Sequence, residues 1–146
     1  MTALKEISIK AVIIGLIVDI GGTFLFFFIF SIIGGILLTS AGRDVDELKD
    51  FAETSTFIVV SSLAGLLFSV FGGYVSARIA GRAEVRNALA TGILSFLVGL
   101  VLFIGAPVSP QSWPELLFLI LIIPCALLGG YACLRSKKGS VSSERL

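Results

Sequence analysis

Four long apolar runs leave this chain few ways to fold. They cover residues 11–38, 57–77, 88–106 and 116–134, and Asp19 is the one charged residue within them. A helix of about 20 residues crosses a hydrocarbon core of roughly 30 Å, so each run is long enough to span a membrane. The runs are apolar on every side, as in FLFFFIF, whereas strands of a membrane β-barrel alternate apolar and polar residues. The sequence therefore predicts an all-α integral membrane protein, a four-helix bundle forming one membrane domain, 1–146.

Composition excludes several classes of protein. The chain is 56% hydrophobic and 14% charged, far from the balance of soluble domains, which makes the lipid bilayer its expected partner. It has no histidine, and its two cysteines, Cys125 and Cys133, lie on one predicted helix. This excludes zinc, haem and iron–sulfur sites, and catalytic triads that need histidine. We therefore expect no enzyme activity, no cofactor, no metal and no nucleic-acid partner.

The basic residues predict the orientation of the helices. All Lys and Arg residues except Arg43 and Lys49 lie before the first run, between the second and third, or after the fourth. Cytoplasmic loops are enriched in these residues, so we expect a multi-pass protein of the cell (cytoplasmic) membrane with both termini in the cytoplasm. The arginines expected at the inner interface are Arg78, Arg82, Arg86 and Arg135.

The segments outside the runs are polar. Residues 39–56 form an acidic outer loop, in which Val45, Leu48 and Phe51 recur every three positions and predict a short helix on the membrane surface. Residues 135–146 form a polar cytoplasmic tail that we expect to be disordered. The basic loop between the second and third runs is short, so these two helices should pack as antiparallel neighbours.

A repeated motif relates the two halves of the chain. The second run ends in Gly72-Gly73-Tyr74 and the fourth in Gly129-Gly130-Tyr131, and in each an arginine follows after three further residues. The motif predicts two helical-hairpin repeats that both begin and end on the inner side, and so are parallel repeats. The alternative explanation is that these residue types are common near inner helix ends.

Small residues recur at every fourth position from Ser61 in the second run to Gly81, four residues after its end. Small side chains let helix backbones approach closely, and in lipid this packing drives helix association. The residues expected to pack helices together are Ser61, Gly65, Gly72, Gly73, Ala77, Gly129 and Gly130. They would serve either packing within one bundle, or association with a second copy or another membrane protein.

Asp19 is the candidate for a functional site. A charged residue at the bilayer centre costs about 2.5–3.5 kcal/mol on insertion scales, so Asp19 should face the bundle or water. Gly15 and Gly22 place it on the small face of its own helix.

Three polar residues share one predicted depth. Each lies nine residues from an inner cation: Asp19 from Lys10, Ser69 from Arg78, and Ser95 from Arg86. At the helical rise, all three should lie about 13 Å inside the inner boundary. They predict a polar intramembrane site for a proton, a cation or a small polar substrate. The alternative is that Asp19 is a neutral, hydrogen-bonded packing residue, or that it lies nearer an interface.

The segment FGGYVSARIAGRAEVRNALATG, residues 71–92, resembles the central hairpin of small bacterial membrane proteins of the YrzE type. In that family a GGY-x-A-A-R-x-A element leads through a short polar loop into another glycine-bearing helix, and Ser76 departs from its alanine-rich form. The resemblance implies a prokaryotic four-helix membrane protein and assigns no activity.

Two functions follow from these observations. The first is a non-enzymatic packing or assembly module that acts through its small-residue faces. The second is a small transporter or channel built around Asp19.

Overall fold

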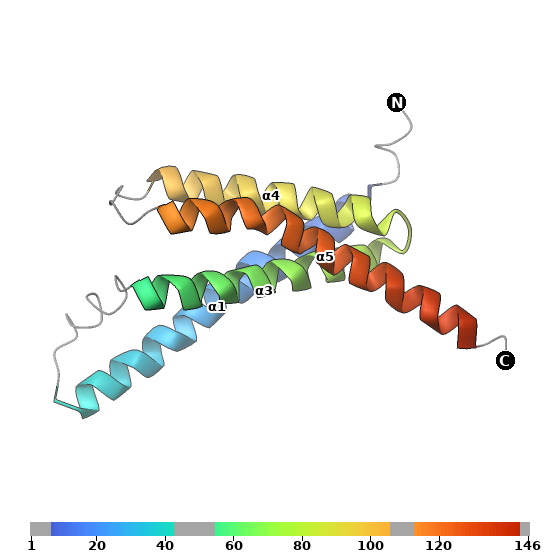
Figure 1. Ribbon diagram of the computed structural model, residues 1–146. Coiled ribbons are helices and arrows are strands. Elements are labelled where there is room, and N and C mark those ends of the chain that lie inside the picture. Colours follow the sequence, from blue (N-terminus) through green and yellow to red (C-terminus); the bar gives the residue numbers. More distant parts are fainter. Residues whose placement is uncertain (1–6, 43–54, 106–112, 144–146) are drawn as a thin grey trace.

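A computed structural model describes residues 7–42, 55–105 and 113–143, and these residues form four helices. They are α1 (Ile9–Ser40), α3 (Ser55–Ala80), α4 (Glu84–Gly105) and α5 (Trp113–Ser143), which run back and forth as a four-helix bundle (Figure 1). The predicted all-α fold is confirmed, and each helix contains one of the four predicted runs nearly in full. The predicted surface helix in the loop 39–56 falls mainly on residues 43–54, which lie outside the described residues.

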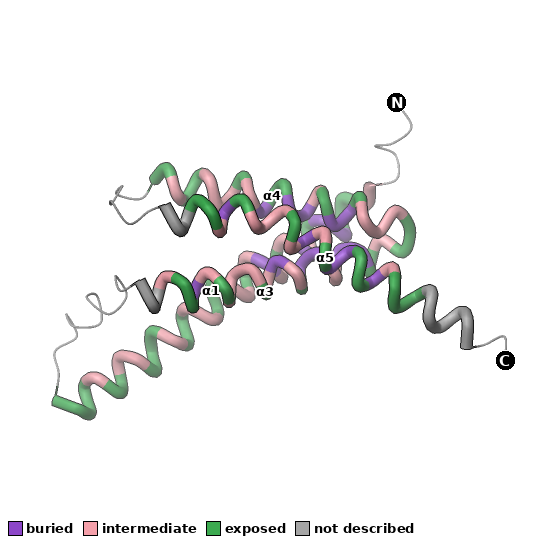
Figure 2. Tube along the Cα trace, viewed as in Figure 1, coloured by how far each residue is buried: buried purple, intermediate pink, exposed green. Residues whose placement is uncertain are grey.

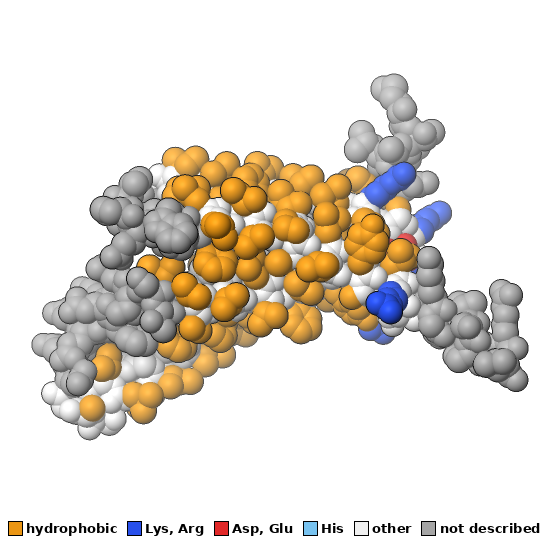
Figure 3. Space-filling model, in the orientation of Figure 1, with side chains coloured by type: hydrophobic (Ala, Val, Ile, Leu, Met, Phe, Trp, Pro, Cys, Tyr) orange, Lys and Arg blue, Asp and Glu red, His pale blue; other side chains and the backbone are white. Residues whose placement is uncertain are grey.

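The bundle has small and polar residues inside and large apolar residues outside. Its largest fully buried side chains are Asn87, Thr91 and Ser76, whereas Phe28 and Ile36 are more than 60% exposed. Exposed apolar side chains cover the sides of the bundle, and the visible Lys and Arg side chains gather at one end (Figure 3). All four helices are long and apolar enough to cross a membrane. This distribution suits a lipid environment, and the chain is a multi-pass membrane protein.

The helix ends differ from prediction mainly at the C-terminus. The prediction of disorder after residue 134 was wrong for residues 135–143, because they continue α5. Arg135, Lys137 and Lys138 are good helix formers and no proline follows Pro124, so the helix can continue beyond the apolar run, although Gly139 is a poor helix former. A contact also holds this extension, because the Lys137 ammonium lies 2.7 Å from the Glu84 carboxylate. At the other end of the chain, Ser8 caps α1, and its hydroxyl accepts a hydrogen bond from Ala11 N at 3.4 Å.

The helices pack closely near one end and separate toward the other. We call the first the basic end, because Arg78, Arg82, Arg86 and Arg135 are exposed there, and the opposite one the far end. α3 packs against α5, α1 packs on α3 and α4, and α4 packs on α5. The buried residues of α1 all lie between Ala11 and Asp19, and its remaining length runs out from the bundle toward the far end (Figures 1 and 2). The bundle is therefore tight at the basic end and open at the far end.

Candidate functional site: a cavity that ends at Asp19

Asp19 is held against α3 by two glycines. A β-carbon on Gly15 would lie 2.7 Å from the carbonyl oxygen of Gly72, and one on Gly72 would lie 2.7 Å from the carbonyl oxygen of Gly15. The backbones of α1 and α3 thus meet directly at this pair. A β-carbon on Gly72 would also lie 2.8 Å from that of Asp19, so a side chain at Gly72 would displace the acid. The two glycines bring Asp19 into the bundle, where its exposed fraction is 4%.

One oxygen of the Asp19 carboxylate accepts a hydrogen bond, and the other has no partner among the described residues. Ser69 Oγ, on α3, donates a hydrogen bond to Asp19 Oδ1 at 2.9 Å. Ser95 approaches the same carboxylate from α4. However, Asp19 Oδ2 and Ser95 Oγ have no hydrogen-bond partner within the part of the chain that the structure describes. Buried polar atoms are normally paired, and these two can be paired either with each other, after a small rotation of Ser95, or with a solute that reaches them.

Asp19 and Ser95 are among the residues that line a cavity of about 550 Å³ between the four helices. Asp19, Ser69 and Ser95 are the lining residues of α1, α3 and α4 nearest to the basic end. From this level the lining continues along the helices to Ile58 and Phe103, toward the far end. On the basic side of Asp19 the helices are in backbone contact, as the glycine pair shows. The cavity therefore extends from the carboxylate toward the far end.

The structure brings together the three residues expected at one depth. Asp19 and Ser69 are hydrogen-bonded, Ser95 lies beside them, and all three are at least 95% buried. Counting along each helix from the basic residues predicted that these three residues lie at one level, and their side chains do lie together. That the group is a functional site stays a prediction.

The predicted packing residues fall into two groups. The glycine motifs and Ala77 lie in close helix contacts near the basic end. A β-carbon on Gly73 would overlap the carbonyl of Ala126, and one on Gly129 would overlap that of Val70. Ser61 and Gly65, nearer the far end, instead line the cavity, where a β-carbon on Gly65 would meet only Thr23 Cγ2 at 3.9 Å.

The two copies of the repeated motif pack differently. In the first copy, Gly72 faces α1 of its own hairpin and Gly73 faces α5. In the second copy the order is reversed, because Gly129 faces α3, whereas Gly130 faces Ala88 of its own hairpin. The two hairpins therefore use equivalent glycines for opposite contacts, and duplication stays a prediction.

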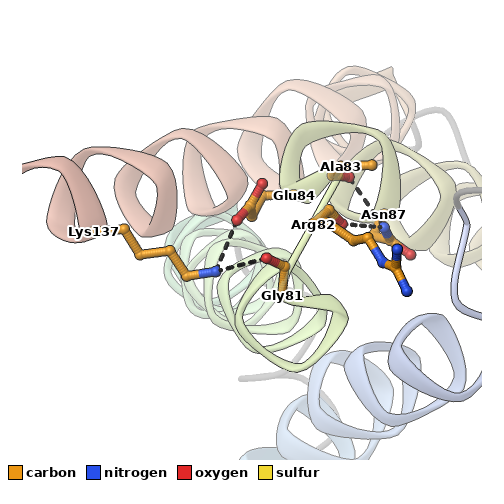
Figure 4. Close-up of polar contacts among 6 residues, drawn as sticks. All are labelled: Gly81, Arg82, Ala83, Glu84, Asn87 and Lys137. Carbon is orange, nitrogen blue, oxygen red and sulfur yellow. Dashed lines mark hydrogen bonds and ion pairs between the residues drawn. The ribbon is translucent and has the colours of Figure 1, made fainter.

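A second buried polar group, centred on Asn87, was missed by the sequence reasoning. Asn87 Oδ1 accepts a hydrogen bond from Ser8 N at 2.8 Å. Asn87 Nδ2 donates to the carbonyls of Arg82 (3.3 Å) and Ala83 (3.0 Å) (Figure 4). Ala83 has a φ of 51°, which is strained for a residue with a β-carbon. Asn87 thus joins the start of α1 to the strained loop between α3 and α4. Its partners are backbone groups, so the role is structural.

The polar group at Asn87 continues one turn along α4. Thr91 Oγ1 lies 2.8 Å from Ser76 Oγ and 3.0 Å from Asn87 O, and it can donate to either. Asn87, Thr91 and Ser95 are spaced by four on α4, which is the signal that could have revealed the group.

The basic end is exposed, and an ion pair between Lys137 and Glu84 lies at its rim. Lys137 Nζ donates to Glu84 Oε1 at 2.7 Å and to Gly81 O at 3.2 Å (Figure 4). Gly81 has a φ of 70° and ends α3, so Lys137 bonds a carbonyl beyond the last turn of that helix. The contact joins the extended end of α5 to the loop between α3 and α4.

The described residues contain no group of three metal-binding side chains, and Cys125 and Cys133 are both unpaired thiols. No protein-family model matches the chain, and neither does any curated protein or solved structure.

Proposed function

We propose that this protein is a small membrane transporter or channel, whose solute site is formed by Asp19, Ser69 and Ser95. One observation carries the proposal: the Asp19 carboxylate is 4% exposed, ends a cavity of about 550 Å³, and has one oxygen without a partner among the described groups. An acid within the membrane is costly to place, and such residues mark ion, proton and substrate pathways in membrane proteins.

The shape of the cavity supports access from one side. The lining follows all four helices away from Asp19 toward the far end, while glycine contacts close the bundle behind it. We also propose that the basic end is cytoplasmic, as the positive-inside rule indicates, so that the cavity opens toward the outer face of the cytoplasmic membrane.

The alternative function, a packing or assembly module, has less support. An assembly module would use the small-residue faces of the helices, but the glycines of those faces already contact neighbouring helices within the bundle. Gly73 and Gly129 lie in the contact between α3 and α5, and Gly72 lies against Gly15 of α1. Association with a second copy or with another membrane protein would need a different surface.

The proposal requires that a water-borne solute can reach Asp19. The test is a cysteine at Ser95, introduced after Cys125 and Cys133 are changed to alanine, in protein reconstituted into lipid nanodiscs. A membrane-impermeant, positively charged methanethiosulfonate should modify Cys at this position. The matched control is Ser76→Cys, at a fully buried serine on the basic side of the cavity.

We expect Ser95→Cys to react at least about tenfold faster than Ser76→Cys, because Ser95 lines the cavity whereas Ser76 is fully buried. Only the thiolate reacts, and a thiol that water cannot reach stays protonated. Both serines are small, so cysteine changes the packing little. Equal, slow reaction at both positions would show that no aqueous path reaches the carboxylate, and the proposal would fail.

A further inference from the structure

We infer that the cavity binds an amphipathic organic ammonium ion, a ligand with one primary amine and an apolar body. This inference rests on the proposed solute site and names its ligand class. It is carried by three features of the cavity: the chemistry of its closed end, the chemistry of its walls, and its volume.

The closed end has an acidic group, and none of the described residues that line the cavity is Lys or Arg. Among the described residues, therefore, no lining residue supplies a cation to pair with Asp19. A buried carboxylate needs a partner of opposite charge or a proton. A primary ammonium has three N–H donors. It could donate to the Asp19 carboxylate and to the hydroxyls of Ser69 and Ser95, since all three residues line the cavity.

The walls are apolar and partly aromatic. Phe24 and Phe27 of α1, Phe103 of α4 and Phe118 of α5 line the cavity between Asp19 and the far end, with leucine, isoleucine and valine among them. These walls would bury an apolar body that extends from the amine toward the opening. Aromatic faces also tolerate a passing cation, because their ring electrons attract it.

The volume and the polar groups of the cavity argue against three other ligands: a bare cation, a divalent metal and a lipid. About 550 Å³ lies within the roughly 300–1,000 Å³ of sites for drug-sized ligands, and is much larger than a bare cation needs. A divalent metal would need more oxygen ligands than one carboxylate and two hydroxyls provide. A lipid acyl chain would fill the walls but leave Asp19 Oδ2 and Ser95 Oγ unpaired, and an anionic head group would be repelled by Asp19.

The test compares two probes of nearly equal shape, 1-naphthylmethylamine and 1-naphthylmethanol. Their binding is measured by titration calorimetry with the protein in nanodiscs of zwitterionic lipid, which gives the amine no anionic surface. Charge-assisted hydrogen bonds are the stronger kind, so we expect the amine to bind roughly tenfold or more tightly than the alcohol. Asp19→Asn should abolish this difference. The matched control is Glu84→Gln, which removes a carboxylate outside the cavity and should leave the difference unchanged.

A second variant covers the case in which Asp19→Asn does not fold. Ser95→Ala removes a hydroxyl that has no partner in the described structure, so it should fold normally and weaken amine binding. Equal affinity for the amine and the alcohol would overturn the inference. Amine binding that Asp19→Asn leaves unchanged would also overturn it, because such binding would be partition into lipid. If either result is found but the cysteine at position 95 reacts with the impermeant reagent, the proposed function stands and only the ligand class is wrong. If that cysteine does not react, both the proposed function and this inference are wrong.

Discussion

The contact between α3 and α5 predicts that Gly73→Ala will destabilise the bundle, although alanine is the better helix former. A β-carbon on Gly73 would overlap the carbonyl oxygen of Ala126 and lie 2.8 Å from its Cα. The obstacle is backbone, so no side chain can rotate to make room. The helices themselves must move apart.

The size of the effect follows from this overlap. Non-bonded carbons at their optimum lie about 3.5–4.0 Å apart, so α3 and α5 must separate by roughly 1 Å. A gap of about 0.5–1 Å forfeits roughly a quarter to a half of the dispersion energy of each affected contact. Overpacking a close-packed interior costs about 1–3 kcal/mol. Because Gly73 lies against backbone, we expect a loss of about 2–3 kcal/mol, and more for Gly73→Leu.

The assay is reversible unfolding of the purified protein by SDS in mixed micelles, followed by helix content. The matched control is Gly35→Ala on α1, where a β-carbon would meet nothing within 4 Å. That change should leave stability unaltered or raise it by up to about 1 kcal/mol, since alanine favours helix over glycine. Equal unfolding free energies for the two variants would refute the reasoning, because they would show that the backbones do not touch at Gly73.

Three further predictions test other parts of the structure. Asn87→Leu should lower the unfolding free energy by about 2–3 kcal/mol in the same assay, because it leaves buried backbone groups unpaired; an unchanged value would contradict its structural role. Asp19→Asn should keep most of the stability by still accepting the Ser69 hydrogen bond, whereas Asp19→Leu should not, and equal stability of the two would argue against that bond. For topology, an impermeant thiol reagent added to intact cells should label a cysteine introduced at Asp46 and miss one at Glu84; labelling at position 84 would reverse the orientation.

The helices could be predicted because lipid imposes a simple rule. Every backbone polar group in hydrocarbon must be bonded within its own segment, so an apolar run of sufficient length becomes a helix. The ends were less predictable. α5 continues to Ser143, since helix-forming residues and the contact between Lys137 and Glu84 extend it beyond the apolar run.

The candidate site was partly predictable, because charged residues mark the boundary from which depth is counted. Asp19 and Ser69 could be placed at one level, although nothing in the sequence gives the hydrogen bond between them. The group around Asn87 was missed, since its partners include Ser8 N and two loop carbonyls. Every residue type carries such backbone groups, so they leave no signal in a sequence.

The small-residue stripe shows why the cavity could not be predicted. Residues spaced by four drift by about 40° per step around a helix with 3.6 residues per turn. The stripe on α3 therefore turns from one neighbour to another. Gly73 lies against α5, whereas Gly65, two steps away, lines the cavity. The surface that each of these residues faces depends on how the helices cross, and the spacing of residues in the sequence does not contain that information.

The close contact and the cavity have a common geometric origin. Glycine lets the backbones of α3 and α5 touch at Gly73 and Gly129, and lets those of α1 and α3 touch at Gly15 and Gly72. Straight helices that touch at one point and cross at an angle must separate away from it. All of these contacts lie on the basic side of Asp19, so the separation falls on the far side, where the cavity opens. The glycines that close the bundle thus also create the space in front of the carboxylate.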